Sequence, residues 1–400
     1  MGMGYEIKDK QIVLCVCGGI AAYKSVELLR LLQKQGAVVR VVMTKNATAF
    51  VGPLTFKTLS GRDVCVNLFD EGGDASIRHI EWAKEADAVI IAPATANVIG
   101  KLASGVADDA LTTFMLAVTS PVILCPSMNT HMYENRIVQR NLDTLEKNGY
   151  HIIEPGAGEL ACGTTGAGRL PEPAVILDRM IFHLLPKDYA GKKLLVTAGP
   201  TQEAIDPVRY ISNHSSGKMG YAIARAAELR GAEVILISGP TSLGSPFNVN
   251  RIDVRSAQEM YDAVFQHMDS ADIIIKVAAV ADYRPANPER EKIKKKEGTL
   301  TLTLEQNPDI LKEIGRRKKG QTIVGFAAET QDLRENAGKK LKEKNLDIIV
   351  GNLVGKSDSG FGTDTNRVTL FFRDGTEESL PVLEKDSVAH VLLDRILKRH

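Results

Sequence analysis

The chain has 400 residues, of which 44% are hydrophobic and 25% charged, and its formal net charge is +1. A single hydrophobic core usually stops growing at roughly 250 to 300 residues, so we expect two domains, and the composition excludes a disordered chain. The balanced charge excludes a general basic field for nucleic acid or an anionic membrane, and neither is expected as a partner.

The N-terminal residues and the cysteines predict a cytoplasmic protein without disulfides. The segment "MGMGYEIKDK" lacks the charged-then-apolar pattern of a secretory leader, and runs such as "ADAVIIAPA" are far shorter than the ~18 residues of a membrane span. An odd number of scattered cysteines argues against a disulfide framework. Cys15 and Cys17 lack the partner cysteines of a zinc site and are expected in a strand. The five cysteines are Cys15, Cys17, Cys65, Cys125 and Cys162.

The first half of the chain predicts alternating strands and helices. Residues 11–44 read as a buried strand, a glycine turn, an amphipathic helix and a second strand. Further buried strands are expected at 86–94, 120–126 and 150–155. Apolar strands joined by helices are typical of an open parallel sheet covered on both faces. We therefore predict an α/β domain over residues 1–189, with a flavodoxin-like, doubly wound parallel sheet.

A similar order of elements restarts after the Pro, Gly and Lys cluster at 186–193, which is the expected domain boundary. Periodicity and turn signals predict a Rossmann-like α/β domain over residues 190–400. Its expected elements are strands at 193–199, 232–238, 272–279, 322–329 and 346–352, a helix at 217–231, a hairpin around Asp374-Gly375 and a closing helix at 386–400.

Ligands of open α/β sheets bind beyond the carboxyl ends of the strands, which directs attention to the residues just after each strand. At a strand-to-helix turn, the backbone N–H groups of Gly18 and Gly19 can hold a phosphate with the help of the helix dipole. Their spacing differs from G-x-G-x-x-G, so a mononucleotide is expected rather than a dinucleotide. The other such segments are Thr44, "PATAN" at 93–97 and "CPSMN" at 125–129.

A lone cysteine, Cys162, stands at the head of the glycine-rich segment "ACGTTGAGR" at 161–169. The glycines reach backbone angles that other residues avoid, so this loop is expected to be mobile and approachable. A thiol on such a loop can be carried to a substrate, but it can equally be an ordinary loop cysteine. These residues alone leave both interpretations open.

Four segments together resemble the signatures of the flavin-dependent cysteine decarboxylases. They are "GGIAAYK" at 18–24, "APATAN" at 92–97, "PSMNTHMY" at 126–133 and "ACGTTGAGR". In the second half, "SNHSSGKMG" and "KIKK" resemble the ligase commonly fused to these enzymes. The whole chain is therefore similar to the bifunctional decarboxylase–ligases of bacterial coenzyme A synthesis. One departure is Tyr133, where the family often has tryptophan; both are amphipathic aromatic residues, and we expect activity to be kept.

The resemblance implies FMN as the cofactor of the first half. In this family the cysteinyl thiol of the substrate is oxidised to a thioaldehyde, the adjacent carboxylate is lost, and the enethiolate is protonated and reduced. The resemblance places Thr44, Thr95 and Asn97 around the flavin, with Gly18 and Gly19 at its phosphate. Asp108 and Asp109 could bind ribityl hydroxyls, but we favour a simple helix start.

The resemblance also assigns three catalytic residues to this half. His79 would assist proton removal, since imidazole titrates near neutral pH; the alternative is a surface or helix-cap histidine. Asn129 would hold the substrate carboxylate without a full countercharge, although an Asx turn or helix cap is an equally ordinary role. Cys162 would donate the proton that allows the final reduction.

In the second half, "AGPTQEAIDPVRYISNHSSGKMG" at 198–220 places Ser, Gly and Lys at a helix amino terminus, as an anion site requires, but differs from a Walker loop. The resemblance gives Asn213 contact with an acyl-nucleotide intermediate; the alternative is a turn asparagine. Lys292, in a lysine-rich segment that otherwise reads as a solvated loop, would stabilise charge on the nucleotide phosphates.

The resemblance further implies a CTP site built from several segments. Asp282 could also help to hold Mg²⁺, and Lys340 and Lys344, four residues apart, fall on one helical face, although both could simply be exposed. The CTP residues implied are Lys276, Val277, Ala278, Ala279, Asp282, Lys292, Pro308, Asp309, Ile310, Phe326, Lys340 and Lys344.

The implied reaction sequence has two steps. The carboxylate of 4'-phosphopantothenate attacks the α-phosphate of CTP, the cytidylate is captured by the amine of cysteine, and the product is decarboxylated to 4'-phosphopantetheine. A decarboxylase of peptide C-terminal cysteines would leave the second half unexplained. A flavin-binding regulatory scaffold is the non-enzymatic alternative, which His79, Asn129 and Cys162 argue against. The family also implies a homo-oligomer, with decarboxylase trimers and ligase dimers that can combine into a dodecamer.

Overall fold

The computed structural model describes residues 7–68, 75–159, 165–294, 299–329, 333–353 and 363–399. The chain divides into two compact units, Met1–Leu185 and Pro186–His400, which we call the N-terminal and the C-terminal unit. Each unit has its own hydrophobic core, as the length of the chain predicts.

The N-terminal unit is built on a parallel sheet with strand order β3-β2-β1-β4-β5-β6. This is the order of a doubly wound sheet, in which the chain moves outward from β1 first in one direction and then in the other. The prediction of a doubly wound α/β domain is thereby confirmed. The strands are β1 (Gln11–Val16), β2 (Val38–Met43), β3 (Val64–Cys65), β4 (Ala88–Ala94), β5 (Val122–Pro126) and β6 (Tyr150–Ile152).

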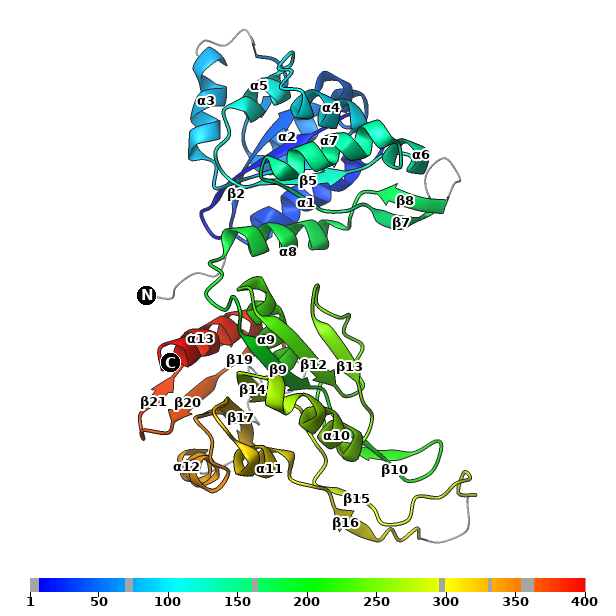
Figure 1. Ribbon diagram of the computed structural model, residues 1–400, viewed down its shortest axis with the longest axis vertical. Coiled ribbons are helices and arrows are strands. Elements are labelled where there is room, and N and C mark those ends of the chain that lie inside the picture. Colours follow the sequence, from blue (N-terminus) through cyan, green and yellow to red (C-terminus); the bar gives the residue numbers. More distant parts are fainter. Residues whose placement is uncertain are drawn as a thin grey trace. The chain divides into compact units, whose positions relative to one another are not determined.

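Helices cover both faces of this sheet (Figure 1). Helix α1 packs on α2 and α8, whereas α4 packs on α7 and α3 on α5. Strand β4 is buried along its whole length, as expected for a central strand between two helical layers. The helices are α1 (Ala22–Lys34), η1 (Lys45–Ala49), α2 (Pro53–Ser60), α3 (Ala75–Glu85), α4 (Ala96–Ala103), α5 (Ala110–Leu116), α6 (Thr130–Tyr133), α7 (Arg136–Lys147) and α8 (Pro173–Leu184).

A small antiparallel hairpin follows the sheet. It pairs β7 (Gly156–Glu159) with β8 (Thr165–Arg169). Strand β8 lies against the segment that follows β5, because Met128 N donates to the carbonyl of Gly168 at 3.0 Å. A Cβ at Gly168 would come within 2.2 Å of the Met128 carbonyl oxygen, and its φ of +147° also disfavours other residues. This glycine therefore allows the close approach of the hairpin to the sheet.

The C-terminal unit repeats the same topology and extends it. Its sheet has the order β13-β12-β9-β14-β17-β18-β20-β21, in which the first six strands are parallel and the pairings β18–β20 and β20–β21 are antiparallel. This confirms the Rossmann-like prediction, including the hairpin around Asp374-Gly375. The strands are β9 (Lys193–Ala198), β12 (Glu233–Ser238), β13 (Asn250–Asp253), β14 (Ile273–Lys276), β17 (Thr322–Glu329), β18 (Ile348–Leu353), β20 (Val368–Phe372) and β21 (Glu377–Ser379).

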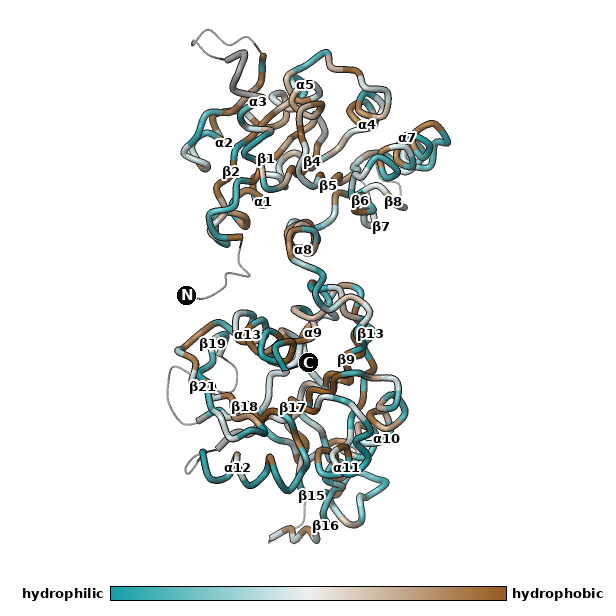
Figure 2. Tube along the Cα trace, turned by 60° about the vertical axis from the view of Figure 1, so that its left-hand side comes forward, coloured by the Kyte–Doolittle hydropathy of each residue, from teal (hydrophilic) through white to brown (hydrophobic). Residues whose placement is uncertain are grey.

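Side chains of successive residues in the central strands pack on opposite faces of this second sheet. Leu194 and Val196 of β9 pack in the core beneath α9 and α13, whereas Leu195 belongs to the core on the other face. Figure 2 shows the hydrophobic colouring along these strands. The helices are α9 (Lys218–Leu229), α10 (Ala257–His267), η2 (Met268–Ser270), α11 (Ile310–Arg317), α12 (Leu333–Glu343) and α13 (Lys385–Leu397).

Among the described residues of this unit, three short strand pairs lie outside the second sheet, and none of them was expected from the sequence. They pair β10 (Gln202–Ala204) with β11 (Tyr210–Ser212), β15 (Tyr283–Pro285) with β16 (Leu304–Gln306), and β19 (Thr365–Asn366) with β22 (Leu383–Glu384). The first two pairs contact one another through β10 and β15. They bring residues near 205 and residues near 290 together.

The first residues of the C-terminal unit pack on its helix α13. The Tyr189 hydroxyl donates to the Leu393 carbonyl of α13 at 2.7 Å, and Arg230 Nε donates to Asp188 at 2.8 Å. Arg230 is 1% exposed and also pairs with Asp394 at 3.0 Å. The buried guanidinium of Arg230 thus joins Asp188, at the start of this unit, to α13.

Cys15, Cys17 and Cys125 are buried free thiols, and burial raises the pKa of Cys17 to about 12. Cys15 lies in β1 as predicted, and Cys17 directly follows that strand. Such groups are protonated and poorly nucleophilic at neutral pH. No helix in the described ranges is long and apolar enough to cross a bilayer.

Candidate active sites

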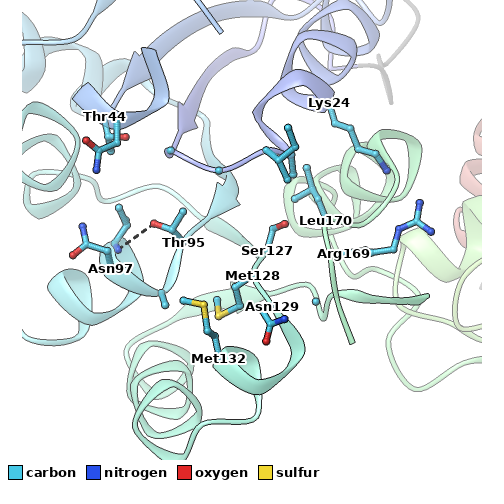
Figure 3. A pocket seen from close by; sticks show the side chains of 18 of the residues that line it. Lys24, Thr44, Thr95, Asn97, Ser127, Met128, Asn129, Met132, Arg169 and Leu170 are labelled. Carbon is cyan, nitrogen blue, oxygen red and sulfur yellow. Dashed lines mark hydrogen bonds between the residues drawn. The ribbon is translucent and has the colours of Figure 1, made fainter. Parts of the chain in front are cut away.

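The N-terminal unit has a pocket of about 960 Å³ at the carboxyl ends of β1, β4 and β5 (Figure 3). It lies where the doubly wound sheet changes direction, between β1 and β4, which is the expected ligand position in this architecture. Six of the residues selected from the sequence line it: Gly18, Gly19, Thr44, Thr95, Asn97 and Asn129.

The glycine turn before α1 has the features of a phosphate site. A Cβ at Gly18 would lie 2.5 Å from Asn46 Cβ, whereas one at Gly19 would meet only Thr95 Cγ2 at 3.8 Å. The N-cap residue Ala21 provides no side-chain hydrogen bond to the first turn of α1. Ala22 N and Lys24 N already donate to the carbonyls of Gly19 and Ala21, both at 3.0 Å, so a phosphate at this turn would depend mainly on the N–H groups that precede Ala22.

Two threonines in the pocket are helix caps. Thr44 Oγ1 accepts from Ala47 N at 3.3 Å, and Thr95 Oγ1 accepts from Val98 N at 3.5 Å. A hydroxyl that accepts in this way can still donate its own hydrogen to a ligand. Capping therefore fixes each hydroxyl at the pocket wall without exhausting its hydrogen-bonding capacity.

Asn129 is also a helix cap, so the alternative role considered from the sequence is confirmed. Its Oδ1 accepts from His131 N at 2.9 Å at the start of α6. The same side chain lines the pocket (Figure 3). Because Met128 is fixed by the Gly168 carbonyl, Asn129 has a defined position relative to β8. Its contact with a substrate carboxylate stays a prediction.

The other two catalytic candidates of this half are only partly located. His79 lies in the first half of α3, and its side chain is outside the described part of the structure. Cys162 lies outside the described residues. The strands on either side of it, β7 and β8, pair with each other, and Arg169 at the end of β8 lines the pocket.

Several polar residues of the pocket were not selected from the sequence, among them Lys24, Ser127 and Arg169. Lys24 Nζ lies 2.8 Å from Glu172 Oε1, at the start of α8. Its place inside "GGIAAYK" was the signal that could have identified it. Asp109 is the N-cap of α5, and its Oδ1 accepts a hydrogen bond from Thr112 N at 2.8 Å. This confirms the interpretation of Asp109 as the start of a helix.

In the C-terminal unit, the candidate CTP residues 277–279 follow β14 at the corresponding change of direction, between β9 and β14. Val277 N and Ala278 N both donate to the Thr197 hydroxyl at 3.2 Å. Ala281 N donates to the Thr201 hydroxyl at 3.0 Å. Both threonines are fully buried, and they fix the backbone of the loop. Sequence reasoning missed them because each lies within or beside an apolar strand.

Asn213 and Asp282 meet at this loop. Asn213 Nδ2 donates to the Val280 carbonyl at 3.0 Å, which connects the segment after β11 to the loop after β14. Asn307 N donates to the Asp282 carbonyl at 2.8 Å, and this connects the same loop to the segment before α11. Three segments far apart in sequence are thus joined around the exposed Asp282 side chain.

Lys276, at the end of β14, lies among charges of both signs. Burial lowers the pKa of Lys276 to about 8; Lys344 adds to this effect, and Asp309 and Asp282 oppose it. Its Nζ donates to the Ala278 carbonyl at 2.8 Å. A bound phosphate would favour the protonated form of this lysine.

Asp309 links α11 to the residue after α12. It caps α11 by accepting from Lys312 N at 3.0 Å, and its Oδ2 lies 2.7 Å from Lys344 Nζ. Burial would raise the pKa of Asp309, but the hydrogen bonds from Lys344 and Lys312 outweigh it and lower the pKa. Pro308 directly precedes this cap.

The other candidate CTP residues differ in their burial and in how close they lie to Lys276. Lys340 lies on α12 close enough to Lys276 to lower its pKa. Phe326 follows Gly325, the partner of Lys276 in the β14–β17 register, and is partly buried. Ile310 is buried in the core, so only its backbone can face a ligand.

Lys292 is exposed, on the segment between β15 and β16. Within the described ranges, the contacts recorded for its neighbour Ile293 lead to Asp206 and Arg209 on the β10–β11 loop, not to the charges around Lys276. The described residues contain no group of three or more His, Cys, Asp or Glu side chains arranged for a metal.

Two family models together match nearly the whole chain. The model described as "Flavoprotein" matches residues 3–184, and "DNA/pantothenate metabolism flavoprotein C-terminal domain" matches residues 189–399. The "Coenzyme A biosynthesis bifunctional protein CoaBC" of Bacillus subtilis (strain 168) is 50% identical over 394 residues, covering 98% of this chain and 97% of the relative.

Solved structures match each unit separately. The C-terminal domain of a "Coenzyme A biosynthesis bifunctional protein CoaBC" is 47% identical, with a TM-score of 0.45, and covers 52% of this chain and 94% of that one. A structure of "FMN-dependent Cysteine Decarboxylases SpaF" is 30% identical, with a TM-score of 0.38, and covers 44% of this chain and 97% of that one.

Proposed function

The chain belongs to the family of bifunctional coenzyme A biosynthesis proteins, and on this premise we propose that it ligates 4'-phosphopantothenate to cysteine with CTP and decarboxylates the product with FMN. It is a bifunctional enzyme with a ligase and a decarboxylase activity. The alternative of a regulatory scaffold without catalysis finds no support among these relatives. We assign the decarboxylase to residues 1–189 and the ligase to residues 190–400, a boundary a few residues beyond the point where the units divide.

The observation that carries the decarboxylase proposal is the convergence of the glycine turn, Thr95 and Asn129 on one pocket. Gly18 and Gly19 would hold the FMN phosphate at the start of α1, and Thr44, Thr95 and Asn97 would contact the rest of the cofactor. FMN supplies, when bound, the two-electron chemistry that oxidises the cysteinyl thiol and later reduces the decarboxylated product.

The chain's own residues bind the substrate and transfer protons. The Asn129 amide would orient the substrate carboxylate without neutralising it, so that neutral CO₂ can leave while the electron pair of the broken C–C bond stays on the oxidised substrate. His79 would accept a proton during oxidation, and Cys162 would return one before the final reduction. A product, 4'-phosphopantetheine, then leaves the pocket.

The ligase proposal is supported by the joining of Asn213, Asp282 and the loop after β14. Lys276, Lys340 and Lys344 would balance the triphosphate of CTP, and Lys292 would stabilise the charge that develops when pyrophosphate leaves. We also assign nucleotide contacts to Val277, Ala278, Ala279, Pro308, Asp309, Ile310 and Phe326.

Asn213 would hold the acyl-cytidylate until the amine of cysteine attacks it. Asp282 would share Mg²⁺ with the phosphate oxygens, a role that requires only one protein carboxylate. Both residues lie at the edge of the sheet where ligands of this architecture bind.

A homo-oligomer in the cytoplasm completes the proposal. Apolar side chains at the pocket, including Ile20, Tyr23 and Met132, are about half exposed or more, at 62%, 59% and 49%. Apolar residues of the β10–β11 and β15–β16 pairs, including Tyr210 and Tyr283, are exposed too. Such patches suit contacts between copies, and we propose trimers through the first unit, dimers through the second and a dodecamer combining them.

One incubation tests both activities. The purified chain is mixed with 4'-phosphopantothenate, cysteine, CTP and Mg²⁺, and pyrophosphate and CO₂ are measured separately. We expect both products, equimolar at completion, from a protein with flavin absorbance. Pyrophosphate without CO₂ would remove the decarboxylase, and neither product would favour the scaffold.

A further inference from the structure

Asp206, on the loop between β10 and β11, is a buried carboxylate that binds two separate segments. Its side chain is fully inaccessible to solvent. Oδ1 accepts from Val208 N and Arg209 N, both at 2.8 Å, and so closes its own turn. Oδ2 accepts from Ile293 N at 3.1 Å, although that residue is 87 positions further along the chain. The two oxygens therefore have different tasks.

Arg209 completes the hold on the same distant residue. Its Nη2 donates to the Ile293 carbonyl at 2.6 Å and lies 3.2 Å from Asp206 Oδ2. Both backbone polar groups of Ile293 are thus bound by one ion pair. Upstream, Glu289 N donates to the Ile205 carbonyl at 2.9 Å. The segment 289–293 is consequently docked against the loop 205–209 at two points.

The charge of Asp206 strengthens this arrangement. Burial alone would raise the pKa of Asp206, but the N–H donors of Val208, Ile293 and Arg209 outweigh it and lower the pKa. The carboxylate is therefore ionised at neutral pH, and its hydrogen bonds are charge-assisted. Lys292 lies between the two docking points, with its own side chain exposed.

We propose that Asp206 and Arg209 are positioning residues for the ligase step: together they clamp Ile293 and so set where Lys292 can place its ammonium group relative to the CTP phosphates. The inference rests on the proposed ligase function, in which Lys292 acts on those phosphates. Neither clamp residue needs to touch the nucleotide. They contribute by restricting the conformations of the segment that carries Lys292, so that less entropy is lost when the lysine contacts the phosphates.

The variant Asp206→Asn separates the two tasks of this side chain. The amide oxygen can keep accepting from Val208 and Arg209, so the local turn is preserved. The amide nitrogen then faces Ile293 N, where donor meets donor, and the link to the Lys292 segment is lost. Arg209→Gln weakens the contact with the Ile293 carbonyl, because the glutamine side chain is shorter and its donor is uncharged.

The experiment uses the full chain and measures single-turnover release of pyrophosphate from CTP and 4'-phosphopantothenate, with cysteine omitted. A charge-assisted hydrogen bond corresponds to roughly a ten- to hundredfold effect. We expect Asp206→Asn to slow this step by that factor, with a change of less than about threefold in the Kd of CTP. Tryptic cleavage after Lys292 and Lys294 should accelerate by about tenfold or more.

Glu203→Gln is the matched control. Glu203 is another buried carboxylate of the same region, and the hydrogen bond that it accepts, from Ala257 N at 2.9 Å, leads to the start of α10. It should leave both pyrophosphate release and cleavage after Lys292 near their wild-type rates.

Each other outcome is decisive. Unchanged cleavage and unchanged pyrophosphate release in Asp206→Asn and Arg209→Gln would overturn the clamp. Equal losses of ligation and of flavin-dependent decarboxylation would also overturn it, because they would indicate general misfolding. If the wild-type chain releases no pyrophosphate, the ligase proposal itself fails, and with it the role of the clamp in that step; the cleavage rates then decide only whether Asp206 holds the segment.

Discussion

At the scale of single residues, polar groups in both sites combine a structural contact with an available binding group. Thr44, Thr95 and Asn129 each cap a short helix while lining the pocket of the N-terminal unit. A cap fixes the position of the side chain, and this reduces the entropy that a ligand contact would otherwise cost. Structural and functional roles therefore support each other at these positions.

Asn129→Asp tests the binding role of this cap. Aspartate caps a helix as well as asparagine does, so the fold and the flavin absorbance should be retained. A carboxylate there repels the substrate carboxylate, and we expect decarboxylation of 4'-phosphopantothenoylcysteine, measured as CO₂, to fall by roughly a hundredfold or more. Asn135→Asp is the control, because Asn135 caps α7 in the same way, through Ile137 N at 2.9 Å, outside the pocket. Equal activity of the two variants would contradict the role of Asn129.

The charge of Lys276 predicts a pH dependence of nucleotide binding. Its pKa of about 8 means that the side chain is protonated below that pH and becomes neutral as the pH rises through it. The apparent KM for CTP, measured by pyrophosphate release without cysteine, should therefore increase above this pH, by at most about tenfold per pH unit. Lys276→Met should flatten the profile. A wild-type KM that is constant to pH ~9.5 would refute a phosphate contact by this lysine.

At the scale of elements, the turn between β1 and α1 offers a matched pair of substitutions. Gly18→Ala places a methyl group against Asn46, so it should destabilise the N-terminal unit by about 1 to 3 kcal/mol and reduce flavin content. Gly19→Ala has space in the free protein and should leave the Tm of flavin-free protein nearly unchanged, yet weaken FMN binding. Thermal denaturation and flavin titration separate the two effects. Wild-type FMN affinity in Gly19→Ala would mean that the phosphate does not approach this backbone.

The long central elements could be predicted because one physical signal dominates them. Strands such as β4 and β17 are buried between helical layers, and their continuous apolar runs report this directly. The pairs β10–β11 and β15–β16 could not be predicted, because strands of three residues are too short to show a clear pattern. The two pairs also contact each other through β10 and β15, which are far apart in the sequence.

The sites show the same division. Gly18, Thr95 and Asn129 follow predicted strands, so sheet topology alone brings them to one edge. Thr197 and Thr201 escaped notice because buried hydroxyls within apolar sequence give no pattern. The connection from Asp206 to Ile293 was equally invisible, because it depends on a tertiary contact between two irregular segments.

At the scale of the whole molecule, each unit has its own sheet, core and site, so the two activities should be separable. Lys292→Met should abolish pyrophosphate release and leave decarboxylation of added 4'-phosphopantothenoylcysteine at the wild-type rate, whereas Asn129→Asp should do the reverse. A mixture of the two variant proteins should then form 4'-phosphopantetheine after a lag, because the intermediate can diffuse between them. No product from the mixture, despite normal single activities, would contradict this independence.

The buried guanidinium of Arg230 has a consequence for how the chain folds during synthesis. It requires Asp188, near the start of the C-terminal unit, and Asp394 of α13, which is translated much later. The N-terminal unit has all its strands by Arg169 and can mature while the ribosome is still at work. The core of the C-terminal unit includes residues of α13, so we expect a chain that stops before α13 to consist of a folded N-terminal unit followed by an unfolded C-terminal segment.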